Sequence, residues 1–208
     1  MIKTNLTFAA LQLALVLVAA AASPKPVVKP NILWLIAEDM SPHFGCYGDP
    51  TVATPNVDRL AREGTLFERA FVTGPICSPG RSALITGMYQ TSIGAQNHRS
   101  GVGKQKIHLP PGVELVPRLF QQAGYFTCNG GYYPAQRRGK TDYNFEFDPR
   151  IYDGTDWAGR QPGQPFFAQI QMLGGKTRDL PAALAKARQR LGKATPPDKL
   201  PLPRYYPR

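Results

Sequence analysis

The sequence is short of acidic residues. Among its 208 residues, Asp and Glu number 14 against 25 Lys and Arg, which gives a formal net charge of +11. Hydrophobic residues make up 42% and charged residues only 19%, a composition that excludes a disordered polyelectrolyte. The 20 glycines and 21 prolines follow no period, which excludes a collagen-like chain. The chain can therefore bury a core, and its surplus of positive charge favours an anionic partner.

Cysteine is also scarce, and no hydrophobic run reaches the roughly 20 residues that span a bilayer. Cys46, Cys77 and Cys128 are too few for a disulfide scaffold. Because their number is odd, at least one thiol is left over. An unpaired thiol in an exported protein is buried and inert, reactive, or chemically converted, and only its surroundings can decide among these.

The N-terminus has the pattern of a secretory signal peptide. Lys3 precedes an apolar run from Phe8 to Ala22, which is interrupted by Gln12 and ends in three alanines before Ser23. We therefore expect residues 1–22 to be removed on export, leaving no stable membrane span and a periplasmic or secreted protein. An uncleaved membrane anchor is the alternative.

The remaining pattern alternates strands with helices. Apolar or alternating runs predict strands over 31–37, 66–72, 125–128 and 166–172, the first of them a buried parallel strand. Proline and glycine punctuation predicts helices over 57–63, 77–86, 112–123 and 180–191, with Ser78 as the cap of the second. This alternation is typical of a sheet with crossover helices, and the predicted fold class is α/β. From residue 137 onward the chain carries 14 basic and 7 acidic residues and becomes rich in proline.

Two adjacent carboxylates, Glu38 and Asp39, directly follow the first predicted strand. Open α/β sheets bind ligands outside the carboxyl ends of their strands. Oxygen ligands suit Ca²⁺, Mg²⁺ or Mn²⁺, although two acids supply only part of the six to eight ligands that Ca²⁺ takes. The alternative is a pair of solvated acids at a strand end.

A second candidate site is the segment Cys77-Ser78-Pro79-Gly80-Arg81, at a predicted helix start. Free N–H groups and the helix dipole attract anions there, and the guanidinium of Arg81 suits a tetrahedral oxyanion. A buried structural cysteine is the alternative. The residues by themselves therefore indicate an anion pocket with a metal.

The three histidines do not have the spacing of a zinc site. His43, His98 and His108 form no H-x-H or H-E-x-x-H motif. His98 follows the helix predicted over 77–86, and both a place in the pocket and an ordinary loop position remain open for it. No nucleic-acid motif accompanies the basic charge, so an anionic glycan is the better polyanion for an exported chain.

Four ordered blocks of this sequence resemble the sulfatases of the alkaline-phosphatase-like superfamily, especially the bacterial branch related to heparan N-sulfatase. They are PNILWLIAEDM followed by GCYG, TPNVDRLAREGTLFERAF, CSPGR with the C-x-P-x-R signature, and SALITGMY. The resemblance covers roughly residues 29–206. It implies that 23–208 is the N-terminal portion of a sulfatase catalytic domain, with a partial sheet flanked by helices and truncated at its C-terminus.

The resemblance also implies roles for individual residues. Glu38, Asp39 and Cys77 would bind Ca²⁺, with Mg²⁺ possible, although Glu38 replaces the more usual Asp. A formylglycine-generating or other sulfatase-maturing enzyme would convert Cys77 to formylglycine, whose hydrate is the nucleophile. Arg81 would hold that hydrate, and Lys140 would act in catalysis and contact the sulfate. His98 is a further candidate substrate contact because of its position after the helix predicted to start at Cys77, and the resemblance does not supply that role.

The implied activity is hydrolysis of a sulfuric ester or sulfamide, in the EC 3.1.6 class, on a sulfated carbohydrate or an aryl sulfate. Two features depart from the family. Asp142 stands where many sulfatases have a His, and no Asp-Asn or Asp-His pair exists to complete the metal site. Two alternatives therefore stay open: a truncated, catalytically inactive fragment, and a basic module that binds sulfated polysaccharide.

Overall fold

The computed structural model describes residues 28–131 and 137–172, together with 189, 196 and 199. The chain divides into a short unit, 1–30, and a larger unit, 31–208, to which all the elements below belong. Its strands and α-helices are β1 (Ile32–Ala37), α2 (Pro55–Glu63), α3 (Cys77–Thr86), α4 (Val116–Gln122), β2 (Phe126–Gly131) and β3 (Phe166–Met172). Four single 3₁₀ turns, η1 (Gly45–Tyr47), η2 (Ser100–Val102), η3 (Pro149–Ile151) and η4 (Trp157–Gly159), lie between them.

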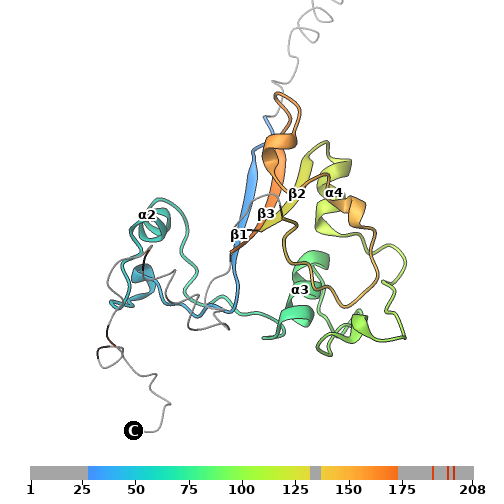
Figure 1. The fold of residues 1–208 in the computed structure, drawn as a ribbon, viewed down its shortest axis with the longest axis horizontal. Coiled ribbons are helices and arrows are strands. Elements are labelled where there is room, and N and C mark those ends of the chain that lie inside the picture. Colours follow the sequence, from blue (N-terminus) through green and yellow to red (C-terminus); the bar gives the residue numbers. More distant parts are fainter. Residues whose placement is uncertain (1–27, 132–136, 173–188, 190–195, 197–198, 200–208) are drawn as a thin grey trace, which may run out of the picture. The chain divides into compact units, whose positions relative to one another are not determined.

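The three strands form a parallel sheet in the order β1-β3-β2. Parallel neighbours need long crossover connections, and helices lie in those connections here, so the predicted α/β class is confirmed. Figure 1 shows α4 beside β2, and α3 beyond the ends of the strands. The carboxyl ends of all three parallel strands therefore point toward the start of α3.

The expectation that the first strand is buried is wrong: no residue of β1 is buried, although the strand is parallel to its neighbour as expected. β1 pairs only with β3 among the described strands, and Leu33 and Leu35 are about half exposed. The other two strands are mostly buried: β3 has a hydrogen-bonded neighbour on each side, and the outer edge of β2 is bridged at Cys128 by Gly154 and at Gly130 by Arg138. An apolar run of strand length indicates a strand, but the segments that cover it decide how deeply it is buried, since β1 and β2 both lie at an edge of the described sheet and only β2 is buried.

Two other expected elements differ from the structure. Residues 66–72 form no strand, and Phe67, Phe71 and Val72 are exposed, because no described strand pairs with this segment. The helix expected over 112–123 begins only at Val116. Gly112 adopts a left-handed turn with φ of 83°, and Leu115 is extended immediately before the helix.

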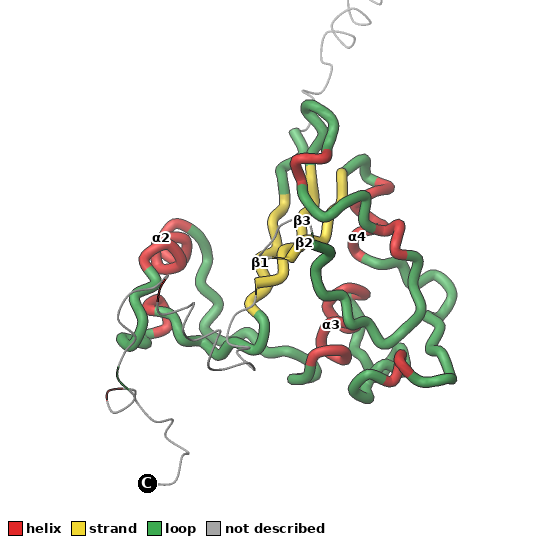
Figure 2. Tube along the Cα trace, in the orientation of Figure 1, coloured by secondary structure: helices red, strands yellow, loops and turns green. Residues whose placement is uncertain are grey.

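Aromatic and aliphatic side chains join the helices to the sheet. Phe120 of α4 stacks on Phe167 of β3 with ring centroids 4.6 Å apart. The buried core cluster lies beside α3 and the loop 143–152, and it comprises Ile85, Ile93, Ala95, Leu115, Tyr143, Phe145, Ile151 and Tyr152. Much of the chain outside the sheet is loop (Figure 2), and proline and glycine account for this.

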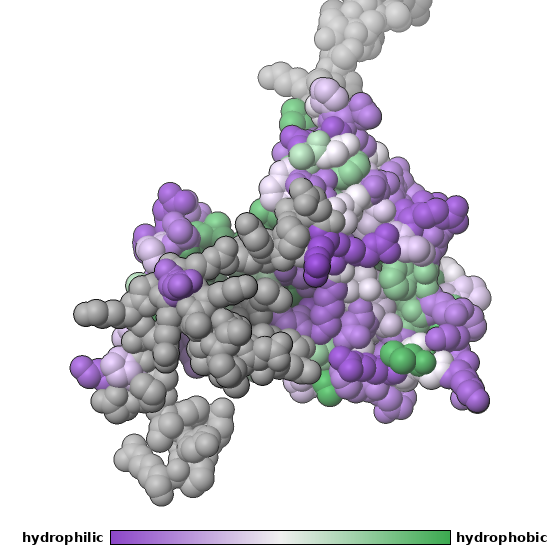
Figure 3. Space-filling view, in the orientation of Figure 1, coloured by the Kyte–Doolittle hydropathy of each residue, from purple (hydrophilic) through white to green (hydrophobic). Residues whose placement is uncertain are grey.

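Several expectations lie outside the described residues: the signal peptide 1–22, nearly all of the helix 180–191, and most of the basic segment after Met172. Within the part of the chain that the structure describes, no helix is long and apolar enough to cross a membrane. The described surface in the view of Figure 3 is mainly hydrophilic, with small hydrophobic areas scattered over it.

Candidate functional site

The candidate site lies where the sheet ladder ends. The amide of Glu38 donates to the carbonyl of Met172 at 3.0 Å, which extends the pairing of β1 and β3 by one residue. Asp39 then adopts a left-handed conformation with φ of 49°. Non-glycine residues rarely adopt this conformation, although Asp tolerates it better than most. The turn brings the second carboxylate toward α3, at an open pocket of about 920 Å³.

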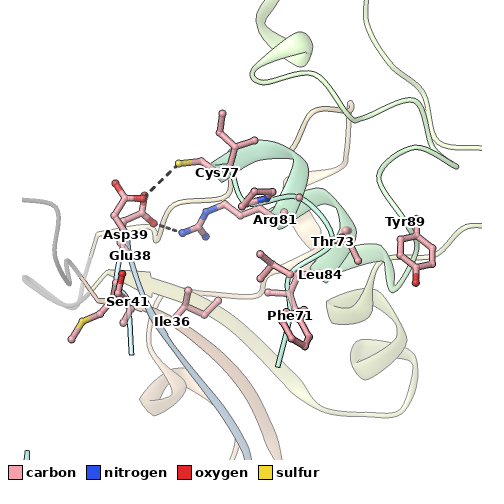
Figure 4. Close-up of a pocket in the computed structure, with 18 of the residues that line it drawn as sticks. Ile36, Glu38, Asp39, Ser41, Phe71, Thr73, Cys77, Arg81, Leu84 and Tyr89 are labelled. Atoms are coloured by element: carbon pink, nitrogen blue, oxygen red, sulfur yellow. Dashed lines mark hydrogen bonds and ion pairs between the residues drawn. The ribbon is translucent and has the colours of Figure 1, made fainter. Parts of the chain in front are cut away.

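Glu38, Asp39 and Cys77 meet in this pocket, as the sequence predicts. One ligand atom from each of the three lies within 4.8 Å of the others, and the Cys77 thiol is 4.0 Å from Oδ1 of Asp39. Figure 4 shows the side chains of Asp39 and Cys77 directed toward one another across the pocket. Glu38 is buried, Cys77 is half-buried and Asp39 is exposed.

This donor set fits a hard cation in part. Two carboxylates suit Ca²⁺ or Mg²⁺, whereas a thiol is a soft ligand that suits neither. Replacing the sulfur of Cys77 by oxygen would make all three donors hard. The three residues therefore fit a hard cation only if Cys77 is converted to a residue with an oxygen ligand.

Arg81 reaches this site from the second turn of α3, with only 9% of its surface exposed. Its Nη2 forms an ion pair with Oε2 of Glu38, drawn in Figure 4. Its Nη1 donates to Oε1 of Gln171 at 2.8 Å and to the carbonyl of Lys140 at 3.2 Å. The guanidinium is thus held from three sides.

Lys140 arrives at the same carboxylate from the other edge of the sheet. Asn129 of β2 holds the preceding Gly139 through two bonds, one to its amide at 3.0 Å and one to its carbonyl at 3.1 Å. The Nζ of Lys140 then forms an ion pair with Oε1 of Glu38 and lies 3.6 Å from Asp142. Both oxygens of Glu38 therefore face a cationic side chain.

His98 lies against the start of α3 and not among the residues that line the pocket. Its Nδ1 is 3.1 Å from the hydroxyl of Ser78, and that hydroxyl also accepts the amide of Arg99 at 2.7 Å. Ser78 is therefore not the helix cap that its position suggests, since Ile76 occupies the cap position and Cys77 is the first helical residue. Asn144 holds the His98 loop by donating to the carbonyls of Ala95 and Asn97.

Two groups at the site carry no obvious sequence signal. Gln171, which bonds Arg81, stands in a largely apolar strand, and the only hint of its role is that glutamine alternates with apolar residues at the end of that strand. Gly139 is the other, because a Cβ at this position would lie 2.2 Å from Oδ1 of Asn129. Only glycine allows the chain before Lys140 to pass this close to the sheet.

Buried groups beneath the site stay neutral at physiological pH. Burial, together with the nearby negative charges of Asp156 and Asp153, raises the pKa of the Cys128 thiol to about 12. Burial likewise raises the pKa of Tyr143 and of Tyr152, whose hydroxyls bond each other at 2.7 Å. Cys128 is accordingly the inert cysteine of the three.

Comparison with known proteins assigns the chain to a family. The sulfatase family model matches residues 30–183, so the chain belongs to the sulfatase family. It is 36% identical over 151 residues to an ulvan-active sulfatase of Formosa agariphila, covering 67% of this chain and 24% of that protein. It is 32% identical over 187 residues to the human N-acetylgalactosamine-6-sulfatase, covering 79% of this chain and 34% of that protein.

A solved structure shares the fold. It is described as a complex with its substrate D-glucosamine-2-N,6-O-disulfate, and it matches with a TM-score of 0.51 and 20% identity over 73% of this chain and 35% of that one. The alkaline-phosphatase-like fold expected from the sequence is thereby confirmed. The chain spans about a quarter to a third of the length of the curated relatives named here.

Proposed function

We propose that this chain forms the nucleophile-bearing part of an exported sulfatase that hydrolyses sulfate esters or sulfamides of sulfated glycans. The observation that carries the proposal is the position of Cys77. It is the first residue of α3, 4.0 Å from Asp39, and it shares one pocket with Glu38 and Arg81. The relatives whose names specify sulfated sugars or polysaccharides support a glycan substrate, with an aryl sulfate as the alternative.

The nucleophile in this proposal is formylglycine, made from Cys77 by a maturing enzyme. A hydrated aldehyde supplies an oxygen nucleophile and can release the bound sulfate by reforming its carbonyl, which a cysteine thiol cannot do. Residue 77 is held for this role by the first turn of α3, whose free N–H groups favour an anion nearby. Arg81 and Lys140 place two positive charges at the same edge of the sheet.

A divalent cation, Ca²⁺ or Mg²⁺, would be held by Glu38, Asp39 and the oxygen of converted residue 77. Such a cation polarises the sulfate and stabilises the charge that develops on its oxygens. Glu38 would then have two duties, because it also orients Arg81 and Lys140. A chain that binds its cation weakly or not at all would be the inactive alternative.

The experiment combines mass spectrometry with turnover. In the purified protein, the tryptic peptide from Ala70 to Arg81 should contain an aldehyde in place of the Cys77 thiol. Hydrolysis of a panel of sulfated sugars and an aryl sulfate should be lost in Cys77→Ala and kept in the control Cys46→Ala, since Cys46 lies in η1, away from the pocket lining. Converted protein that hydrolyses none of the panel would overturn the proposal.

A further inference from the structure

Gln171 occupies a special position in the central strand. It is the penultimate residue of β3, is paired in register with Ile36 of β1 and Gly131 of β2, and is only 6% exposed. A buried amide side chain loses its hydrogen bonds to water, and bonds to other protein groups must replace them. Its Oε1 makes one such bond, which it accepts from Nη1 of Arg81 at 2.8 Å.

The amide has only one workable orientation. Guanidinium nitrogens only donate, so the oxygen of Gln171 must face Arg81 and its nitrogen must face away. That nitrogen is buried and has no hydrogen-bond partner among the described residues. A buried unsatisfied donor costs about 1–3 kcal/mol. An apolar side chain would avoid this cost, so what the glutamine contributes here is the acceptor for Arg81.

The bond to Gln171 completes the restraint on Arg81. Glu38 holds Nη2, and Gln171 together with the carbonyl of Lys140 holds Nη1. Without Gln171, the guanidinium could turn about its bond to Glu38, because the 3.2 Å bond to Lys140 is the weaker of the two on Nη1. The acceptor is also neutral, so it orients Arg81 without competing with the charge of Glu38.

From this geometry we infer that Gln171 is a positioning residue, which fixes the guanidinium of Arg81 beside Glu38 and residue 77. The inference rests on the proposed sulfatase function. Gln171 is not itself among the residues that line the pocket; it acts through Arg81, which is.

The chain provides a matched control in Gln169. It lies two residues earlier in β3, is 2% exposed, and accepts its bond from the hydroxyl of Tyr152 at 3.0 Å instead of from Arg81. Gln169→Leu and Gln171→Leu therefore remove the same group from the same strand. Gln171→Glu keeps an acceptor for Arg81, and Gln171→Asn keeps the amide on a side chain that is one methylene shorter.

The test uses two readouts on the same purified protein. In NMR spectra of protein labelled at arginine, the Nη signals of Arg81, assigned by Arg81→Lys, should be separate in the wild type and in Gln169→Leu. They should merge in Gln171→Leu, because the guanidinium then rotates freely, and should stay separate in Gln171→Glu. Turnover by Gln171→Leu should fall roughly ten- to a hundredfold in kcat with little change in KM, as expected for a misplaced catalytic group.

The outcomes separate the two proposals. Unchanged Arg81 signals in Gln171→Leu would overturn the positioning role, whether or not the wild type turns over substrate. A wild type without turnover but with merged signals in Gln171→Leu would overturn the sulfatase function and keep the role of Gln171. If Gln171→Leu does not fold, Gln171→Asn takes its place with the same expected result, because its amide cannot reach Arg81.

Discussion

The helices α2 and α3 differ in burial although their sequence signals are similar. Each has a proline in its first turn and a glycine directly after its last residue. None of the residues of α2 is buried, whereas α3 buries five, of which Ser78, Arg81 and Ser82 are polar. Those three side chains have hydrogen-bond partners on other segments, and α2 makes its side-chain bonds with the adjacent turn η1. Burial in this chain therefore follows the available polar partners as much as hydrophobicity.

The largest difference in stability between the two helices should appear when one aliphatic side chain is removed from each. Ile85 of α3 is 1% exposed within the core cluster, and Leu60 of α2 is 66% exposed. Ile85→Ala should lower the free energy of unfolding by about 3 kcal/mol, because it leaves a cavity. Leu60→Ala should change it by less than about 0.5 kcal/mol. Urea unfolding measures both, and equal losses would show that α2 is packed as tightly as α3.

The glycine inside α3 provides the second test. Replacing a helical glycine by alanine normally stabilises a helix by up to about 1 kcal/mol. A Cβ on Gly80, however, would lie 2.8 Å from the carbonyl oxygen of Gly74. Gly80→Ala should therefore destabilise the protein by about 1–2 kcal/mol through overpacking. A rise in the thermal midpoint would mean that the loop at Gly74 can move away.

Alkaline pH should distinguish Cys128 of β2 from Cys46 beside α2. The pKa of Cys128 is raised from 9.0 to about 12, so the folded protein keeps a proton that the unfolded chain loses. Stability should therefore fall as pH rises from 9 toward 12, by on the order of 1 kcal/mol at pH 10 from this group. Unfolding at pH 8 and pH 10 measures the loss.

Cys128→Ala should flatten that pH dependence, because it removes the thiol whose pKa is raised. Iodoacetamide at pH 8.5 should also alkylate the half-buried Cys46 in native protein and spare Cys128, which is fully buried. Rapid alkylation of Cys128 would show that β2 opens readily.

The smallest expected effect concerns the contact between η1 and α2. Oδ1 of Asp58 accepts the amide of Cys46 at 2.8 Å and the hydroxyl of Thr54 at 2.9 Å. Asp58→Asn weakens both bonds and should cost about 0.5–1 kcal/mol. Because few contacts tie this segment to the sheet, the loss should appear as faster hydrogen exchange at the Cys46 amide, with amides in β3 unaffected. Faster exchange in β3 would show that the two regions unfold together.

Much of the fold was accessible from local patterns. Apolar runs located β1 and β3, and proline and glycine located α2 and α3, because these signals act within a few residues of chain. The predicted strand over 66–72 failed because a strand also needs a partner, and no run of side chains specifies one. The same limit explains why β1 was expected to be buried but lies at the edge of the described sheet.

The candidate site likewise has a part that the sequence indicated and a part that only the tertiary structure showed. By itself the sequence identified Glu38, Asp39, Cys77 and Arg81, since each lies at a strand end or a helix start where backbone geometry already determines the chemistry. Only the tertiary structure could show that Glu38 faces both Arg81 and Lys140, that His98 bonds Ser78, and that Gln171 restrains Arg81. These contacts join residues 20 to 102 positions apart in sequence, and they form only when the fold brings α3 to the carboxyl ends of the strands and folds the loops that carry His98 and Lys140 against it.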